Sequence, residues 1–297
     1  MVAIPTLGNN SFDSGDNGRM CGRYVSPEEA EIERFWHIGR QNSNPFPRRY
    51  NVTPASIIPV LRLDRATGEI ELVNARWGLI PNWWKDAKPP RNSHNARSEE
   101  AATKPMWKGP LAKSRCLIPA AGWYEWKQVE RTDPASGEIV KAKQPHFFHL
   151  PGDQLFAFAG VVAMWKPAND ADWQASCAVF TREAVGPAAE VHDRMPVVLP
   201  KGAQAAWLDP QVTDPVQAMS AARATGVIEV EHHVVSNRVN TAAADDRQLI
   251  EKKNCNADAP VPKQDPGQAQ VNESRWKEVK SQRVRRPRAR IPTGPGK

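Results

Sequence analysis

Apolar and polar positions along the chain predict a fold made mainly of strands. The segments concerned either alternate or are continuously apolar, and they are rich in β-branched and aromatic residues, which favour strands. They cover residues 55–63, 68–80, 114–129, 146–150, 155–165, 175–184 and 228–236. A turn around Asp64–Gly68 separates the first two segments, so we expect them to pair as a hairpin.

Helix signals are fewer and shorter. One helix is predicted after Ser26, which serves as N-cap, with Pro27 as the first helical residue and Glu29 completing a capping box. Residues 201–208 and 214–226 predict two more short helices. We therefore expect an α+β fold, a single domain with a strand-rich, barrel-like mixed sheet core and a few flanking helices.

The two ends of the chain differ from its middle. Residues 1–19 are rich in Gly, Asn, Asp and Ser and predict a disordered leader, whereas residues 20–250 form the predicted domain. Residues 251–297 are polar, Pro-rich and basic, and predict a disordered tail. The tail holds twelve Lys and Arg against five Asp and Glu, while the other 250 residues hold 28 of each sign. The arginine-rich stretch 283–290 would add non-specific affinity for nucleic acid.

Composition excludes several classes of protein. No run approaches 18 apolar residues and no signal-peptide pattern opens the chain, so we expect a cytoplasmic protein with no membrane contact. We also expect a monomer. The four cysteines lie far apart, without a C-x-x-C pair, which argues against a zinc site or a disulfide framework. We expect neither a metal nor a cofactor.

Cys21 directly follows a methionine, Met20. A lone cysteine is usually a small buried apolar residue. If Met20 were an initiator and were removed, however, Cys21 would carry a free α-amine, with a pKa of about 8, beside its thiol. Such a 1,2-aminothiol captures aldehydes, because the amine forms a Schiff base and the thiol closes it to a thiazolidine ring. An internal cysteine cannot do this, since its nitrogen is an amide.

Two further stretches contain side chains suited to nucleic acid. Asn95 and Arg97 lie two residues apart and share one face of an extended segment, where an amide and a guanidinium suit a phosphate or a sugar. The alternative is a turn asparagine and a solvated arginine. Trp83 and Trp84 are adjacent in a loop and suit base stacking, unless they pack against the Pro-rich segment that follows.

Glu125 is flanked by aromatic residues. Alternation places Tyr124 and Trp126 on one face of the strand and Trp123 and Glu125 on the other. A carboxyl group in aromatic surroundings tends to have a raised pKa and can act as a general acid or base. The alternative is an exposed glutamate on an edge strand.

His192 and Arg194 also lie two residues apart, before an apolar strand. Histidine is the usual proton carrier near neutral pH. The alternative is a structural histidine, hydrogen-bonded beside Asp193.

Six motifs occur in order and together resemble one family, the SRAP (SOS-response-associated peptidase) proteins. They are M-C-G-R-Y at 20–24, R-Y-N-V-T-P at 49–54, W-G-L-I-P-x-W-W at 77–84, N-A-R-x-E at 95–99, A-G-W-Y-E-W at 121–126 and V-H-D-R-M-P-V at 191–197. The resemblance covers residues 20–245. It implies a protein whose N-terminal cysteine forms a thiazolidine crosslink with abasic sites in single-stranded DNA.

The resemblance also implies roles for individual residues. The catalytic group would comprise Cys21, Asn95, Glu125 and His192. The DNA contacts would be Arg23, Arg97 and Arg194 on the backbone, with Trp83 and Trp84 near the damaged nucleotide. The family name further records a proposed thiol autopeptidase activity.

The nineteen-residue leader departs from the family pattern. Either the true start is Met20, or the leader is real and is cleaved between Met20 and Cys21. Two other functions stay open, namely a thiol peptidase that acts on its own leader or on other proteins, and a non-catalytic module that binds single strands through its tryptophans and arginines.

Overall fold

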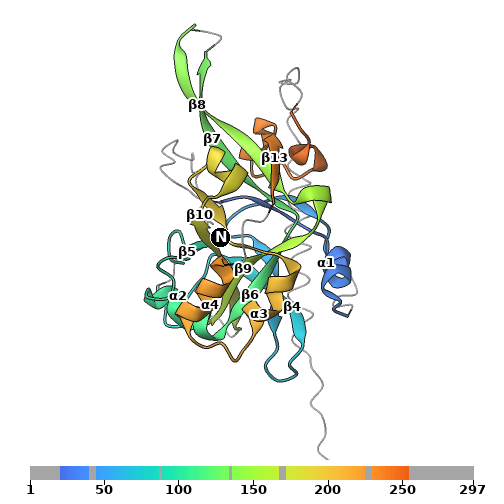
Figure 1. Ribbon diagram of the computed structural model, residues 1–297, viewed down its shortest axis with the longest axis vertical. Helices are drawn as coiled ribbons and strands as arrows, with labels where there is room; N and C mark the ends of the chain where they lie inside the picture. The colour runs from blue at the N-terminus through green and yellow to red at the C-terminus, as the bar shows by residue number, and fades with distance from the viewer. Residues whose placement is uncertain are drawn as a thin grey trace, which may run out of the picture. The chain divides into compact units, whose positions relative to one another are not determined.

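The computed structural model (Figure 1) describes most of the predicted domain. The described residues are 21–39, 45–86, 89–133, 136–166, 172–224 and 229–253. The predicted leader, residues 1–19, and the predicted tail beyond residue 253 lie outside them.

Five strands close on themselves to form a barrel. In order around it they are β10 (Gln174–Glu183), β4 (Ile70–Trp77), β3 (Ile57–Leu63), β6 (Arg115–Ala120) and β9 (Phe156–Trp165), which pairs again with β10. The β10–β4 pair is parallel and the others are antiparallel, so the sheet is mixed. Three short strands extend it: β5 (Asn95–Arg97), β11 (Arg194–Pro196) and β12 (Val198–Leu199). The predicted α+β fold with a barrel-like mixed core is confirmed.

A second sheet of five strands packs against the barrel. Its order is β13 (Glu231–Val234), β8 (Ile139–His149), β7 (Gly122–Thr132), β1 (Tyr24–Ser26) and β2 (Arg49–Val52). Strands β7 and β8 form a long hairpin whose outer part projects from the domain (Figure 1). Trp123 and Phe148 from this sheet join barrel residues in one apolar core.

The predicted strand over residues 114–129 is two strands in different sheets. β6 belongs to the barrel and β7 to the second sheet, with the break at Ala121. The next residue, Gly122, lies so close to β8 that a Cβ there would come within 2.3 Å of the Phe147 ring and 2.5 Å of the Phe148 carbonyl oxygen. Glycine is therefore required where the chain passes from one sheet to the other.

In the described part of the chain, four α-helices flank the sheets: α1 (Glu29–Trp36), α2 (Pro105–Lys113), α3 (Lys201–Leu208) and α4 (Pro215–Arg223). The predicted N-cap of the first helix is wrong. The cap is Glu28, which forms a capping box with Glu31, because Ser26 is still paired in β1. The sequence did not reveal α2, since Gly109 and Pro110 lower its helix propensity. None of the helices described is long and apolar enough to cross a membrane.

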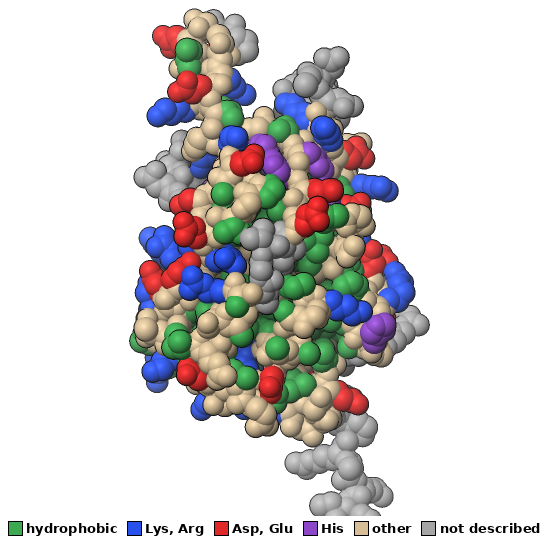
Figure 2. All heavy atoms as spheres, in the orientation of Figure 1, with side chains coloured by type: hydrophobic (Ala, Val, Ile, Leu, Met, Phe, Trp, Pro, Cys, Tyr) green, Lys and Arg blue, Asp and Glu red, His purple; other side chains and the backbone are tan. Residues whose placement is uncertain are grey.

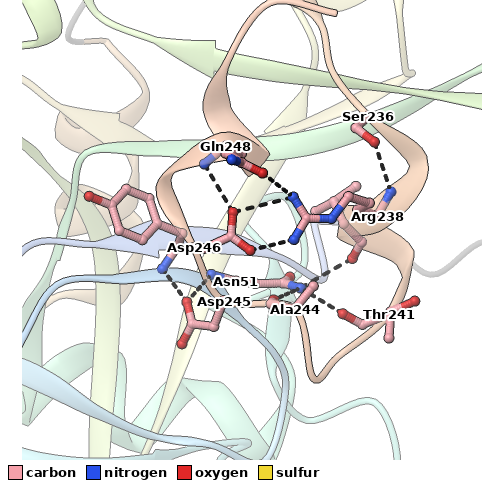
Figure 3. Close-up of polar contacts among 10 residues, drawn as sticks. Asn51, Ser236, Arg238, Thr241, Ala244, Asp245, Asp246 and Gln248 are labelled. Atoms are coloured by element: carbon pink, nitrogen blue, oxygen red, sulfur yellow. Dashed lines mark hydrogen bonds and ion pairs between the residues drawn. The ribbon is translucent and has the colours of Figure 1, made fainter. Parts of the chain in front are cut away.

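The last described segment, residues 236–253, is fastened to β2 by a polar network (Figure 3). The side-chain amide of Asn51 donates hydrogen bonds to the carbonyl oxygens of Val239, Thr241 and Ala244. The Asp245 carboxylate accepts from the main-chain N–H of Asn51 at 3.0 Å, and Arg238 forms an ion pair with Asp246. We call residues 236–253 the C-terminal clasp, because they hold β2 and, through it, β1.

Candidate active site

Cys21 lies three residues before the start of β1, with only 5% of its surface exposed. Its main-chain N–H donates a hydrogen bond to Glu125 Oε1 at 3.0 Å. Its carbonyl oxygen accepts one from Asn95 Nδ2 at 3.2 Å. Three of the four residues predicted as catalytic therefore meet at one point, although the chain separates Cys21 from Asn95 by 74 residues and from Glu125 by 104.

Strand pairing explains how Glu125 reaches Cys21. β7 lies between β1 and β8, and Tyr24 of β1 is the register partner of Trp123. Trp123 packs into the core shared with the barrel, while Tyr124 packs into a separate cluster on the other face. The predicted alternation is thus confirmed. Glu125 is 2% exposed on a central strand, so the alternative of an exposed edge-strand glutamate is wrong.

Burial changes the acid–base behaviour of both groups. Loss of hydration raises the pKa of Glu125 to about 8, so its carboxyl group holds its proton at neutral pH. Burial, and then the charge of Glu125, raises the pKa of the Cys21 thiol well above its usual range. The pair therefore contains a carboxylic acid able to donate a proton and a thiol that needs a proton acceptor before it can attack.

The fourth predicted catalytic residue, His192, lies in a loop beside this pair. Its Nδ1 accepts a hydrogen bond from the main-chain N–H of Arg194 at 3.0 Å and lies 3.0 Å from Asp193 Oδ1. After burial, the negative charge of Asp193 is a further cause of the raised pKa of Glu125, which places this loop within electrostatic range of the site. Sequence reasoning did not assign Asp193 a role, although it lies inside the V-H-D-R motif.

Two of the three predicted DNA-contacting arginines are held by protein groups. Arg194 donates two hydrogen bonds to the Glu99 carboxylate. Arg23 donates to Asn51 Oδ1 at 2.9 Å and to the Asn240 carbonyl oxygen at 3.0 Å. Both guanidinium groups are therefore held in place by contacts within the domain.

Arg97 differs from the other two arginines. Its side chain is 56% exposed, and the carboxylate of Glu100 lies 3.9 Å away. Its guanidinium is therefore the most accessible of the three.

The two adjacent tryptophans, Trp83 and Trp84, differ in their exposure to solvent. Trp83 is 52% exposed, whereas Trp84 is half-buried and its carbonyl oxygen accepts a hydrogen bond from Trp165 Nε1 at 2.9 Å. Their ring centroids lie 6.0 Å apart. Of the two rings, Trp83 offers the larger surface for stacking.

The fold and the site together define a class of protein, in which a closed mixed barrel and a second sheet bury a cysteine whose main-chain nitrogen faces a carboxylic acid. The chain belongs to the SRAP family: the family model described as SOS response associated peptidase matches residues 20–242. The match begins at Met20 and ends at residue 242, so it excludes both the leader and the tail.

Named relatives agree with this assignment, and a solved structure shares the fold. The chain is 34% identical over 234 residues to the protein named abasic site processing protein YoqW of Bacillus subtilis (strain 168), covering 78% of this chain and 99% of that protein. It is 30% identical over 231 residues to abasic site processing protein HMCES of Gallus gallus, covering 68% of this chain and 65% of the relative. A crystal structure of a Bacteroides thetaiotaomicron protein shares the fold, with a TM-score of 0.64, 19% identity and coverage of 78% and 99% of the two chains.

Proposed function

We propose that this protein processes abasic sites in single-stranded DNA by forming a covalent thiazolidine crosslink through Cys21. The observation that carries the proposal is the 3.0 Å hydrogen bond from the Cys21 main-chain nitrogen to Glu125 Oε1. When Cys21 is the first residue, that nitrogen is an α-amine, and the carboxyl group of Glu125 already lies against it. The names of the relatives support abasic sites as the substrate.

The reaction needs proton transfers that these residues can provide. An abasic deoxyribose is mostly a closed hemiacetal, and His192, together with Glu125, moves the protons that open it to the aldehyde. The Cys21 amine attacks C1′ to give a carbinolamine. Glu125 then donates its proton to the departing hydroxyl, water leaves, and a Schiff base forms. The thiol attacks the same carbon while its proton passes to the Glu125 carboxylate, which closes the ring.

Orientation and reversal complete the scheme. The hydrogen bond from Asn95 to the Cys21 carbonyl oxygen holds the nucleophile in place, which accelerates attack by fixing its geometry. The Schiff base can also branch to β-elimination, a lyase side reaction. Proton transfer by His192 and Glu125 in the opposite sense would release the protein from DNA.

The DNA would lie over the exposed groups near this site. Arg97 would contact the phosphate backbone and Trp83 would stack on a base, since both side chains are exposed. Arg23 and Arg194 would contribute positive charge to the same surface while they keep their hydrogen bonds to Asn240 and Glu99.

A crosslinking experiment tests the proposal. Protein beginning at Cys21 is incubated with single-stranded DNA that contains one abasic site, then heated and separated on a denaturing gel. We expect a heat-stable adduct that is lost in Cys21→Ser and retained in Cys116→Ser, a matched control because Cys116 is a fully buried barrel cysteine. Protein whose residues 1–20 remain attached, as verified by intact mass, should form no thiazolidine. An equally heat-stable adduct from Cys21→Ser would reject the mechanism, and binding without preference for abasic DNA would favour a simple single-strand binding module.

A second function, removal of the leader by autoproteolysis, is favoured by the backbone at Cys21. Its φ of 38° lies in the left-handed region, which costs an L-residue about 1–2 kcal/mol. Cleavage of the 20–21 peptide bond would abolish that dihedral and release the strain. Intact-mass measurement of the full chain tests this: a fragment beginning at Cys21 should accumulate, and both Cys21→Ala and Glu125→Gln should prevent it. Cleavage at the same rate in both variants would reject autoproteolysis.

A further inference from the structure

His146 lies across the strand pair from Glu125. The two are register partners in the antiparallel β7–β8 ladder, so their side chains leave the same face with Cβ atoms about 5 Å apart. Both are buried, with 8% of His146 and 2% of Glu125 exposed. His146 is thus a polar neighbour of the buried acid that the resemblance to the family did not assign a role.

A second histidine, His232, is hydrogen-bonded to His146. Nδ1 of His146 and Nδ1 of His232, on β13, lie 3.0 Å apart, so one of the two nitrogens donates a hydrogen to the other. The His232 ring stacks on Phe148, and Phe148 stacks on Trp123, with centroid separations of 4.9 and 5.0 Å. This stack fixes the ring that receives or supplies the shared proton.

The outer histidine reaches solvent. His232 is half-buried, and in Figure 2 histidine side chains appear at the surface in the region where Figure 1 places β13. The charge of Glu190, in the segment before His192, acts on His232. Among the residues that the structure describes, no group of three or more His, Cys, Asp or Glu side chains is placed to hold a metal ion. The pair is therefore better suited to proton transfer than to metal binding.

Burial, and then the charged groups nearby, keep the His146 ring neutral. Those that act on it are Lys127 from β7 and His232 and His233 from β13, with Glu125 as its register partner. Burial, and then His232, lowers the pKa of His146 to about 4. A neutral imidazole can accept a proton at one nitrogen and release one from the other.

The proposed crosslinking reaction requires such a route. At pH 7 the Cys21 amine, with a pKa of about 8, is mostly an ammonium group. Its reaction with an aldehyde forms one C–N and one C–S bond, breaks the C–O bond and yields the ring, one water molecule and one proton. Glu125 is the nearest base to that ammonium group once it has lost its own proton, yet it is shielded from solvent.

We propose that His146 and His232 form a relay that carries this proton from Glu125 to solvent before the amine attacks and returns it during reversal. The relay rests on the proposed crosslinking function. Both histidines act through Glu125 and do not touch the DNA, so they are positioning and relay residues.

Single-turnover crosslinking rates between pH 6 and 9 test the relay. The protein begins at Cys21, and the variants are His146→Ala and His232→Gln, with His233→Gln as control. His233 neighbours His232 but points to the opposite face, where its Nε2 bonds the Ile250 carbonyl oxygen. We expect both relay variants to be at least about 10-fold slower at pH 6–7 and to approach wild type at pH 9, where the amine is already neutral and no net proton is exported. Free imidazole should restore the rate of His146→Ala, and the control should match wild type.

Other results would overturn either the relay or the proposed function. Wild-type rates in both relay variants, or a slowing that is equal at every pH and insensitive to imidazole, would overturn the relay. If His146→Ala does not fold, as judged by its melting curve, the more exposed His232→Gln decides alone. Absence of any adduct from the wild-type protein would instead reject the proposed function.

Discussion

Arg194 and Glu99 are joined by a two-pronged ion pair, with the guanidinium nitrogens 3.0 and 2.9 Å from the two carboxylate oxygens. Arg194 also donates to the Thr181 carbonyl oxygen, and its side chain is only 13% exposed. The pair connects the loop that carries His192 to the turn after β5, the strand that contains Asn95. A DNA phosphate that binds Arg194 would have to share it with Glu99.

Glu99→Gln should lower the melting temperature at pH 7 by about 2–4 °C, because it removes a screened, bidentate ion pair that contributes roughly 1 kcal/mol. Burial opposes ionisation of Glu99, but its bonds to Arg194 prevail and hold its pKa at about 2. Since this pKa lies below that of an unfolded glutamate, about 4.3, the stabilisation is present above pH 4.3 and is lost as the pH falls toward 2. Melting curves from pH 3 to 7 should therefore converge at the acid end. Glu100→Gln, at an exposed neighbour, is the control, and equal melting temperatures for wild type and Glu99→Gln at pH 7 would contradict the prediction.

Glu125→Gln should raise the melting temperature at pH 9 relative to wild type. The folded-state pKa of Glu125, about 8, lies above that of an unfolded glutamate, so wild-type stability declines as the pH rises from about 4.3 through 8. Glutamine keeps the shape without this ionisation, so the difference between the two proteins should shrink at pH 5. The same variant should crosslink about 10²–10⁴ times more slowly, as expected on loss of one general acid. A variant that melts lower than wild type at both pH values would mean that the carboxyl group is ionised in the folded protein.

Arg97→Ala should weaken binding to single-stranded DNA and reduce the slope of log K against log[salt] by about 1, because it removes one phosphate contact. Binding isotherms at several salt concentrations measure both effects. Arg34→Ala is a suitable control, since Arg34 is an exposed arginine on α1. Equal losses for the two variants would show that only net charge matters.

Trp83→Ala should lower affinity for single-stranded DNA by about 1–3 kcal/mol, the contribution of one stacked base. The melting temperature should change little, since the ring is already half exposed. Trp173→Ala removes a tryptophan of similar exposure and should leave affinity unchanged. Fluorescence titration with a short oligonucleotide gives both affinities, and unchanged binding in Trp83→Ala would argue that the ring does not contact DNA.

Sequence patterns predicted the barrel strands well, because alternation and β-branched residues reflect burial directly. For β8 they predicted only residues 146–150, whereas the strand begins at Ile139. The outer half of this strand is polar and exposed, so it lacks the apolar pattern. The meeting of Cys21, Asn95 and Glu125 was predicted through ordered motifs, whereas local pattern alone left each with a structural alternative. Contacts set by register across strands were not predicted. The pairing of Glu125 with His146 and that of Arg194 with Glu99 depend on which strands become neighbours, and a single sequence does not display this.

The C-terminal clasp has a consequence for the order of events on the ribosome. Cys21 is among the earliest residues to be synthesised, but the β1–β2 edge beside it is fastened by Asn51 to carbonyl groups near residue 240, and Arg23 reaches the Asn240 carbonyl oxygen. The site around Cys21 cannot be completed until almost the entire domain has emerged, and contacts so distant in sequence form slowly. If Cys21 is already N-terminal, its aminothiol in the nascent chain is exposed to solvent throughout this interval. Small metabolic aldehydes would then compete with DNA for the cysteine before the protein has folded.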